Sequence, residues 1–417
     1  MKTLKAIVAK YNATSLILRI LVGLIVGAVL AVLVPGAGWL EEFGNLFVGA
    51  LKGIAPVLVF VIVASALAQG TSKLDRRFGT VIWLYMLTTF LAAAIAVITS
   101  FLFPQTIVLA EAAESEVVPQ GLGEVLNTLL TNFVANPVSA LLNGNYIGIL
   151  FWACLFGLAM KKYGAESTKV FLANTADAVS QIVRWIINLA PFGIMGLVYT
   201  NVVSNGLSIF TQYGRLLALL VGTMLFMALI VSPLIIFIYL HCNPYPLVFR
   251  CLKESGLTAF FTRSSAANIP VNMTLCDKLG LDKDMYSVSI PLGATINMDG
   301  AAITITIMTL AAANTLGLQV SLPAAILLSV MSALGACGAS GVAGGSLLLI
   351  PMACSLFGIS NDIAMQVVGV GFIIGVVQDS VETALNSAGD VEFAATAEYH
   401  QWLKEGKPLP EFLGGKK

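Results

Sequence analysis

The sequence predicts an all-α polytopic membrane protein with eight transmembrane helices and two re-entrant helical hairpins. Three observations predict this class. Hydrophobic residues make up 58% of the 417 residues and charged residues 11%, whereas about a quarter of the residues of a soluble domain are charged. Apolar runs of spanning length recur through the first part of the chain, and paired runs too short to span follow in the second part.

The first part of the chain contains six apolar runs of spanning length. They cover residues 15–35, 43–70, 79–104, 121–160, 174–204 and 210–240. Lys and Arg gather before the first run and after the second, fourth and sixth, while the loops 36–42, 105–120 and 205–214 contain neither. The positive-inside rule therefore puts the N-terminus in the cytoplasm, and six spans return the chain there.

Two pairs of short apolar runs follow. Residues 323–335 and 346–358 would each form a helix of about 20 Å, little more than half a bilayer. The segment between them, ACGASGVAGG, is too rich in glycine to continue a helix. Residues 246–280 repeat this pattern around a serine-rich tip, TRSSAANIP (262–270).

The second part is therefore expected as hairpin, span 286–312, hairpin and span 363–395, which leaves the C-terminus in the cytoplasm. Interrupted elements at matching positions of two units indicate an inverted-repeat transporter with its site near the bilayer midplane. Two ordinary spans with loose middles are the alternative.

One polar stripe runs down the predicted last span. Its members are spaced three, four and four residues apart: Asp379, Glu382, Asn386 and Asp390, with Thr383 beside Glu382. Acidic groups in a membrane need partners, yet residues 284–403 contain no Lys or Arg, and Arg263 is one of very few candidate cations. This deficit indicates bound metal cations, a substrate ammonium or protonated carboxyl groups.

The predicted span 286–312 contains Asn-Met-Asp-Gly at residues 297–300. Asn297 and Asp299 would point about 200° apart on a regular helix, so a shared site requires the helix to unwind, which Gly300 permits. Unwound carbonyls with amide and carboxylate oxygens suit alkali or alkaline-earth cations. A hydroxyl cluster in the third span, Tyr85, Thr88 and Thr89, is a further candidate, although membrane threonines usually bond their own helix.

Enzymatic interpretations fit poorly. Asp390 follows a glycine as in aspartyl intramembrane proteases, but the motif Gly-x-Gly-Asp is absent. Gly338-Ala-Ser340-Gly matches the serine pattern of rhomboid-like proteases, but no histidine lies within a membrane segment to activate Ser340. We therefore predict no enzyme. A cation channel uses similar carbonyls and acids and remains an alternative, although two hairpin tips meeting at one site favour occlusion.

These motifs together resemble the dicarboxylate/amino acid:cation symporter family, over nearly the whole chain and in span order. The resemblance implies the glutamate-transporter fold, a homotrimer whose transport domains move across the membrane like elevators. Within 1–245, spans 2, 4 and 5 would form the trimerisation scaffold, and spans 1, 3 and 6 would be peripheral, with spans 3 and 6 belonging to the transport domain. Residues 246–395 would form the transport core and 396–417 a cytoplasmic tail.

The resemblance also implies a substrate site. Asp379 would bind the substrate ammonium, while Asn386 and the first tip would hold the α-carboxylate. The second tip, residues 341–344, would close over the substrate, and Arg263 is expected to pair with Asp379. The implied substrate-binding residues are Ser264, Ser265, Val342, Gly344, Asp379, Glu382, Thr383 and Asn386.

Three sodium sites are implied in the same way, and no organic cofactor. The first comprises Gly293, Asn297, Asn386 and Asp390. The second comprises Thr295 and Met298 with second-tip carbonyls near Ala336 to Ala339. The third comprises Tyr85, Thr88, Thr89, Asn297 and Asp299.

One departure from the family pattern bears on the substrate. Members that carry acidic substrates have an arginine where this chain has Glu382, and two anions repel each other in a low dielectric. Glu382 would instead accept a hydrogen bond from a hydroxyl. Ala301 and Ala343 also replace the family's usual threonine and proline. The resemblance thus implies sodium-coupled import of serine and threonine across a bacterial inner membrane; other small neutral amino acids, acidic amino acids and a cation channel are alternatives.

Overall fold

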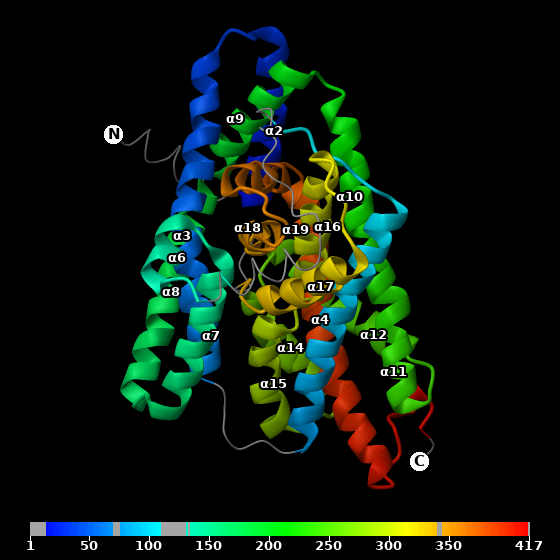
Figure 1. Ribbon diagram of the computed structural model, residues 1–417. Coiled ribbons are helices and arrows are strands. Elements are labelled where there is room, and N and C mark those ends of the chain that lie inside the picture. The colour runs from blue at the N-terminus through cyan, green and yellow to red at the C-terminus, as the bar shows by residue number, and fades with distance from the viewer. Residues whose placement is uncertain (1–13, 70–75, 110–130, 132–133, 340–343, 416–417) are drawn as a thin grey trace, which may run out of the picture.

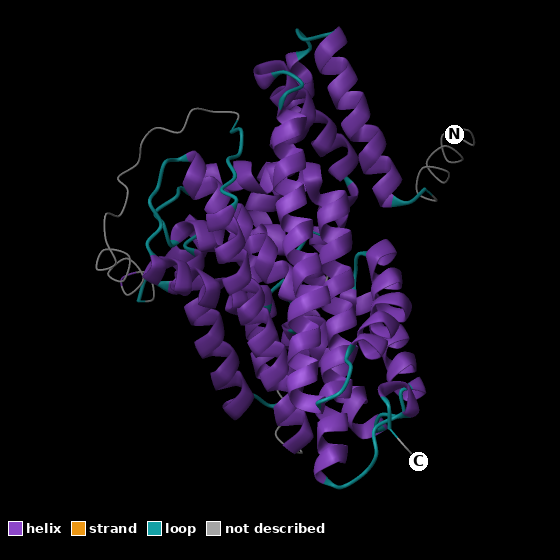
Figure 2. Ribbon diagram, turned by 90° about the vertical axis from the view of Figure 1, so that its right-hand side faces the viewer, coloured by secondary structure: helices purple, strands orange, loops and turns teal. Residues whose placement is uncertain are grey.

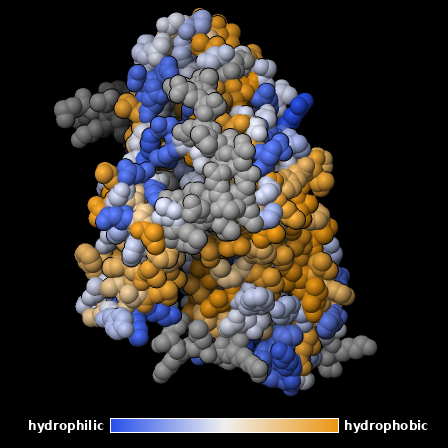
Figure 3. Space-filling model, viewed as in Figure 1, coloured by the Kyte–Doolittle hydropathy of each residue, from blue (hydrophilic) through white to orange (hydrophobic). Residues whose placement is uncertain are grey.

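The computed structural model describes residues 14–69, 76–109, 131, 134–339 and 344–415, and these ranges contain helices but no strand (Figures 1 and 2). Within them five helices are long and apolar enough to cross a membrane, or six if one bent pair counts as a single span. Apolar side chains also cover a broad part of the face shown in Figure 3. The predicted class, a helical multi-pass membrane protein, is thus confirmed, whereas the number of eight spans stays a prediction.

The first three predicted spans correspond to long helices. They are α2 (Leu16–Leu33), α3 (Glu41–Ala68) and α4 (Arg76–Leu102), with a short 3-10 turn, η1 (Gly38–Leu40), before α3. Close backbone contact joins α2 to α9 (Ala190–Asn205), because a Cβ at Gly23 would lie 2.2 Å from the Pro191 carbonyl oxygen. Small residues commonly permit such contacts between membrane helices.

The predicted span 121–160 is wrong in its boundaries. Much of 121–133 lies outside the described residues, and the remainder forms two helices, α6 (Pro137–Asn143) and α7 (Tyr146–Tyr163). Gly144 ends α6 in the left-handed region at φ +64°, and the Asn145 side chain caps α7 by accepting from the Gly148 N–H at 3.1 Å. These two residues provide a stop and a start signal that the apolar pattern hides.

The predicted span 174–204 is also two helices. α8 (Glu166–Asn188) and α9 are bent by 53° relative to each other, and Pro191 lies in the first turn of α9. Proline lacks the N–H that would continue the preceding helix. The predicted span 210–240 is confirmed as one continuous element of α10 (Ile209–Phe226), a π-helical segment η2 (Met227–Val231) and α11 (Ser232–Leu240).

A helical pair with a short turn occupies residues 245–278. Its elements are α12 (Tyr245–Cys251), the π-helical segment η3 (Leu252–Gly256), α13 (Leu257–Thr262) and α14 (Ser265–Lys278). The tip is shorter than the predicted 262–270, because Arg263 closes α13 with φ +52° and Ser264 caps α14 by accepting from the Ala267 N–H at 3.2 Å.

The expected interruption of the seventh span is confirmed. α15 (Lys283–Ile296) stops before Asn297, and α16 (Asp299–Thr315) starts after Met298. Neither intervening residue is helical, with φ and ψ of −91° and 81° at Asn297 and −123° and 50° at Met298.

The second predicted pair and the last span follow. They comprise α17 (Leu322–Ala336), the 3-10 turn η4 (Ser346–Leu349), α18 (Ile350–Ser355) and α19 (Asn361–Lys404), with the turn η5 (Glu411–Leu413) in the tail. Residues 340–343 of the predicted second tip lie outside the described residues. α19 runs beyond the predicted 395, because its last turns stay packed: the Tyr399 hydroxyl, for example, donates to the Leu279 carbonyl at 2.8 Å.

α16 and α19 form the interior of the molecule. They contact each other, and α4, α17 and α18 surround α16 (Figure 1). Most residues of both helices are buried, including all of Asp299–Ala313. The polar groups of the interrupted span therefore face the polar stripe of the last span inside the protein.

Candidate cation and substrate site

Hydrogen bonds join the interruption between α15 and α16, and the first turn of α16, to α19. Asn297 Nδ2 donates to the Asn386 carbonyl at 3.1 Å and to Asp390 Oδ1 at 3.0 Å. The Gly300 N–H donates to Asn386 Oδ1 at 2.8 Å. The break thus places Asn297 and the α19 stripe in direct contact, as expected for a shared site.

Three glycines allow this close approach. A Cβ at Gly300 would lie 2.8 Å from Glu382 Cα, one at Gly293 would lie 2.7 Å from Asp390 Oδ1, and one at Gly389 would lie 2.8 Å from Asn297 Nδ2. Gly300 was expected to permit unwinding, and this reason is wrong because Gly300 lies within the first turn of α16. Glycine is required at position 300 because α19 occupies the space that a Cβ would fill.

Hydroxyl groups of α4 complete this polar region. Thr89 Oγ1 lies 3.0 Å from Asp299 Oδ1, Thr88 Oγ1 lies 3.5 Å from Asn297 Oδ1, and the Tyr85 hydroxyl donates to the Asp390 carbonyl at 2.9 Å. Both threonine hydroxyls also lie within hydrogen-bonding distance of the Tyr85 carbonyl. The back-bonding expected of membrane threonines is therefore present together with the contacts to the predicted site.

The oxygen atoms of these side chains and carbonyls are suitable ligands for a hard monovalent or divalent cation. Asp299 and Asp390 are 1% and 0% exposed, and neither takes part in an ion pair within the described ranges. A buried carboxylate without a countercharge is costly. The groups that meet here offer oxygen ligands from carboxylates, amides, hydroxyls and carbonyls. The described residues contain no group of three or more His, Cys, Asp or Glu side chains that could hold a metal.

Two segments that would form the second implied sodium site, the end of α15 and the end of α17, lie side by side. Asn386 Nδ2 lies 3.4 Å from Met298 Sδ, and the Cys337 thiol donates to the Ile296 carbonyl at 3.7 Å, which places the end of α17 beside the end of α15. Ala336 and Ala339 are buried at that end. The Thr295 hydroxyl donates to the Leu292 carbonyl of its own helix at 2.7 Å.

The expected ion pair between Arg263 and Asp379 is present. Arg263 Nε lies 2.6 Å from Asp379 Oδ2, and both side chains are buried. The pair joins the turn between α13 and α14 to α19. One turn further along α19, Thr383 Oγ1 donates to the Asp379 carbonyl at 2.7 Å.

For the other predicted substrate residues, in the two tips, the structure gives burial, a helix cap and backbone conformation. Ser265 is buried in the first turn of α14, and the Ser264 hydroxyl is the helix cap. Gly344 has φ +73°, which a glycine adopts without strain. Val342 lies outside the described residues.

Glu382 is surrounded by donors that the sequence analysis missed. Oε2 accepts from Thr304 Oγ1 at 2.7 Å, from Ser346 Oγ at 2.9 Å and from the Gln378 amide. A spacing of four residues puts Gln378 on the same helix face as Glu382, which is a signal that could have found it. No local pattern points to Thr304 or Ser346.

A second buried cluster was also missed. Its members are Ser255, Asn268, Asn272 and Ser387, each 0% exposed and joined by several hydrogen bonds, such as Asn268 Nδ2 to Ser387 Oγ at 2.7 Å. Asn272 Nδ2 lies 3.4 Å from Asp390 Oδ2. This cluster connects the first helical pair to the carboxylate of the candidate cation site.

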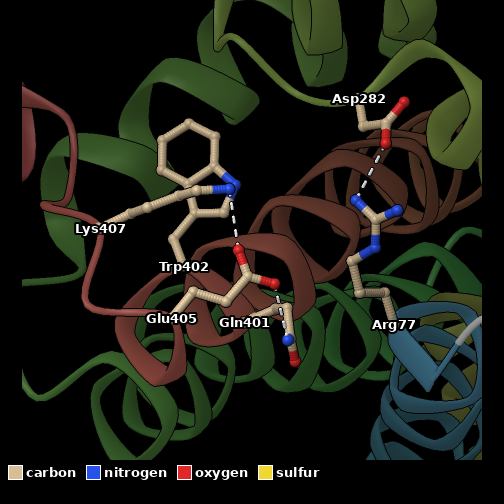
Figure 4. Close-up of a pocket in the computed structure, with 6 residues that line it drawn as sticks. All are labelled: Arg77, Asp282, Gln401, Trp402, Glu405 and Lys407. Carbon is tan, nitrogen blue, oxygen red and sulfur yellow. Dashed lines mark hydrogen bonds and ion pairs between the residues drawn. The ribbon is translucent and has the colours of Figure 1, made fainter.

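A polar pocket lies apart from these groups, where α4 and α15 begin and α19 ends (Figure 4). Arg77 pairs with Asp282 at 3.0 Å, and Glu405 lies between Gln401 and Lys407. The hydrogen bond from the Lys407 ammonium lowers the pKa of Glu405 from its ordinary value, and that from Gln401 adds to the effect. None of the predicted site residues lines this pocket.

The fold and the site define a multi-pass helical membrane protein with a buried, oxygen-rich site at an interrupted helix, as in ion-coupled transporters. Comparison with known proteins is more specific. The chain belongs to the sodium:dicarboxylate symporter family, whose profile matches residues 16–399. The resemblance drawn from the motifs is thereby confirmed, and so is the prediction of a transport rather than an enzymatic role.

Several relatives carry the name Serine/threonine transporter SstT. The protein from Bifidobacterium adolescentis is 76% identical over 416 residues, which cover 100% of this chain and 97% of the relative. That from a Streptococcus agalactiae serotype III strain is 59% identical over 95% of this chain and 98% of the relative. A Streptococcus thermophilus protein is 56% identical over 96% of this chain and 100% of the relative.

Proposed function

We propose that this protein imports serine and threonine across a bacterial inner membrane and couples their uptake to the inward movement of sodium ions. The observation that carries the coupling is the pair of buried carboxylates, Asp299 and Asp390, which form no ion pair among the described residues and lie beside hydroxyl groups of α4 and the Asn297 amide in the break between α15 and α16. The names of the relatives support the two substrates.

The proposed sodium ligands fall into three groups. Asp390, Asn386, Asn297 and Gly293 would hold one ion, and Asp299 with Asn297 and the α4 hydroxyls would hold another. Thr295, Met298 and carbonyls at the end of α17 would hold the third. Asn297 is shared by the first two groups, and its contacts with both α4 and α19 support that role.

The substrate would lie against α19. Asp379 would bind its ammonium in competition with Arg263, while Asn386, Ser264 and Ser265 would hold its α-carboxylate. Glu382 is also buried there, and its negative charge disfavours glutamate and aspartate as substrates. Small neutral amino acids other than serine and threonine are the second candidate substrates.

We further propose the architecture of the family for the whole chain. Eight spans, two re-entrant pairs (α13 with α14, and α17 with α18), cytoplasmic termini and a homotrimer with elevator-like transport domains make up this proposal. The burial of α16 and α19 within one subunit supports their place in the transport core. Sodium would bind first and order the break between α15 and α16, so that movement follows when both ligands are bound.

Uptake of labelled serine by purified protein in liposomes tests the proposal. We expect saturable uptake when sodium is high outside and none when choline replaces sodium. Equal uptake driven by a proton gradient in sodium-free buffer would contradict sodium coupling. A sodium current without amino acid, together with no saturable uptake, would favour the channel alternative.

A further inference from the structure

Three donors converge on a single carboxylate oxygen of the buried Glu382. Thr304 Oγ1 and Ser346 Oγ lie 2.7 Å and 2.9 Å from Oε2, and Gln378 Nε2 donates to the same atom. Within the ranges that the structure describes, no side chain donates to the second oxygen, Oε1. Glu382 is therefore held through one oxygen, and its other oxygen keeps its capacity to accept.

The heavy-atom distances restrict how the hydrogens of this cluster are shared. Gln378 Nε2 also lies 2.7 Å from Thr304 Oγ1, so its two hydrogens serve Thr304 and Glu382. Thr304 accepts this bond and has its own proton for Glu382 Oε2 or for the Gly300 carbonyl at 3.0 Å. The opposite orientation of the Gln378 amide would put its oxygen against the carboxylate, which is repulsive.

The cluster draws on three separate elements and is buried throughout. Thr304 comes from α16, Ser346 from η4, and Gln378 and Glu382 from α19, and none is more than 5% exposed. Hydrogen bonds to a charged group in such surroundings are stronger than neutral ones. The orientation of the Glu382 carboxylate is thus determined by the packing of three elements rather than by α19 alone.

Glu382 also lies one turn of α19 from Asp379, which the proposed function assigns to the substrate ammonium. Residues three apart share a helix face, so an amino acid bound to Asp379 through its ammonium, as proposed above, would lie along the face of α19 that carries Glu382. A carboxylate oxygen accepts a hydrogen bond from a hydroxyl, whereas a methyl group at that place leaves the buried acceptor unpaired.

We propose that Thr304, Gln378 and Ser346 are positioning residues that hold Glu382 so that Oε1 accepts a hydrogen bond from the hydroxyl of a β-hydroxy amino acid. This inference rests on the proposed function and names the chemistry that separates serine and threonine from alanine. Serine and alanine differ by the hydroxyl alone, so their ratio measures this contact.

Thr304→Val tests the inference, with Thr306→Val as its matched control. Both threonines are buried in α16, and the Thr306 hydroxyl has no hydrogen-bond partner among the described residues. Competition by unlabelled serine and alanine against sodium-driven uptake of labelled threonine gives the serine-to-alanine preference. We expect Thr304→Val to lower this preference about 5- to 10-fold, and Thr306→Val and Thr304→Ser to retain it.

An unchanged preference in a Thr304→Val protein that still transports would overturn the positioning role, as would an equal change in Thr306→Val. If Thr304→Val does not fold, Gln378→Met and Ser346→Ala provide the same comparison, with the same expected fall. Sodium dependence should stay as in the wild type, because none of the three residues contacts the candidate cation ligands Asp299 or Asp390. A wild-type protein without sodium-driven uptake of serine or threonine would instead refute the proposed function.

Discussion

At the scale of single residues, the buried ion pair of Arg263 and Asp379 affects the stability of the fold. Their side chains are 7% and 4% exposed, and the pair joins the first helical pair to α19. Loss of one partner leaves an uncompensated charge in a low dielectric, whereas loss of both removes the problem. The pair was expected from the family resemblance, and the count of charges made Arg263 one of very few candidate cations for the acidic stripe.

We therefore expect Arg263→Gln to lower the free energy of unfolding by about 3 kcal/mol, seen as a lower melting temperature in detergent. Arg263→Gln combined with Asp379→Asn should recover much of this loss, since no charge is then left unpaired. The control is Lys407→Gln, which breaks an exposed pair with Glu405 and should have little effect. Equal losses of unfolding free energy in Arg263→Gln and Lys407→Gln would show that burial of the Arg263–Asp379 pair is unimportant.

Residue patterns on one helix were readable from the sequence, and contacts between helices were not. The stripe of Asp379, Glu382, Asn386 and Asp390 follows from helical periodicity, and all four residues are buried as expected. Asn272 beside Asp390 and Thr304 beside Glu382 depend on which helices meet, which no local pattern states.

At the scale of elements, the contact of α16 with α19 requires a glycine. A Cβ at Gly300 would lie 2.8 Å from Glu382 Cα and 2.9 Å from the Glu382 carbonyl oxygen. These are backbone atoms of a long helix and cannot turn aside as a flexible side chain would. The two helices would have to separate, and the hydrogen bond from the Gly300 N–H to Asn386 would lengthen.

Gly300→Ala should consequently abolish most uptake and destabilise the fold by about 1–3 kcal/mol. Gly222→Ala is the control, because Gly222 also lies within a helix, α10, and a Cβ there would meet nothing within 4 Å. Melting temperature and sodium-driven uptake of both variants provide the measurement. Wild-type uptake by Gly300→Ala would mean that α16 and α19 do not pack as described.

The elements were predicted best where polar residues or charge mark their ends in the apolar pattern. The break between α15 and α16 was expected from Asn-Met-Asp-Gly, and the span 210–240 matches a continuous helix. The span 121–160 was wrong because caps such as Asn145 interrupt an apolar run without changing its hydrophobicity. The predicted first tip, 262–270, was too long because α14 already starts at Ser265, with Ser264 as its cap, and Pro270 lies inside this helix.

At the scale of the whole molecule, the carboxylates of the candidate cation site link ion binding to folding. A ligand that binds the native state stabilises it, by about 2.7 kcal/mol at a concentration one hundred times Kd. Asp299 and Asp390 contact groups from α4, from α14 and from the break between α15 and α16, so an ion bound there would hold several elements together.

Sodium should therefore raise the melting temperature of the purified protein, while choline at the same ionic strength should not. Asp390→Asn should remove most of this rise, because it removes one of the two unpaired charges. Asp362→Asn is the control on the same helix, since Asp362 is exposed and pairs with Lys52. A sodium effect of equal size in Asp390→Asn and the wild type would place the ion elsewhere.

The sequence by itself determined the membrane class, the long N-terminal apolar runs, the interrupted span and the acidic stripe of this protein. These depend on hydrophobicity, helical period and charge count, which are local properties of the chain. Only the tertiary structure decided that Gly300 is needed for contact with α19, that Asn272 reaches Asp390, and that Thr304 and Ser346 join Gln378 in holding Glu382. The physical reason is that a buried polar group takes its partners from whichever elements pack beside it, and those elements lie far away in the chain.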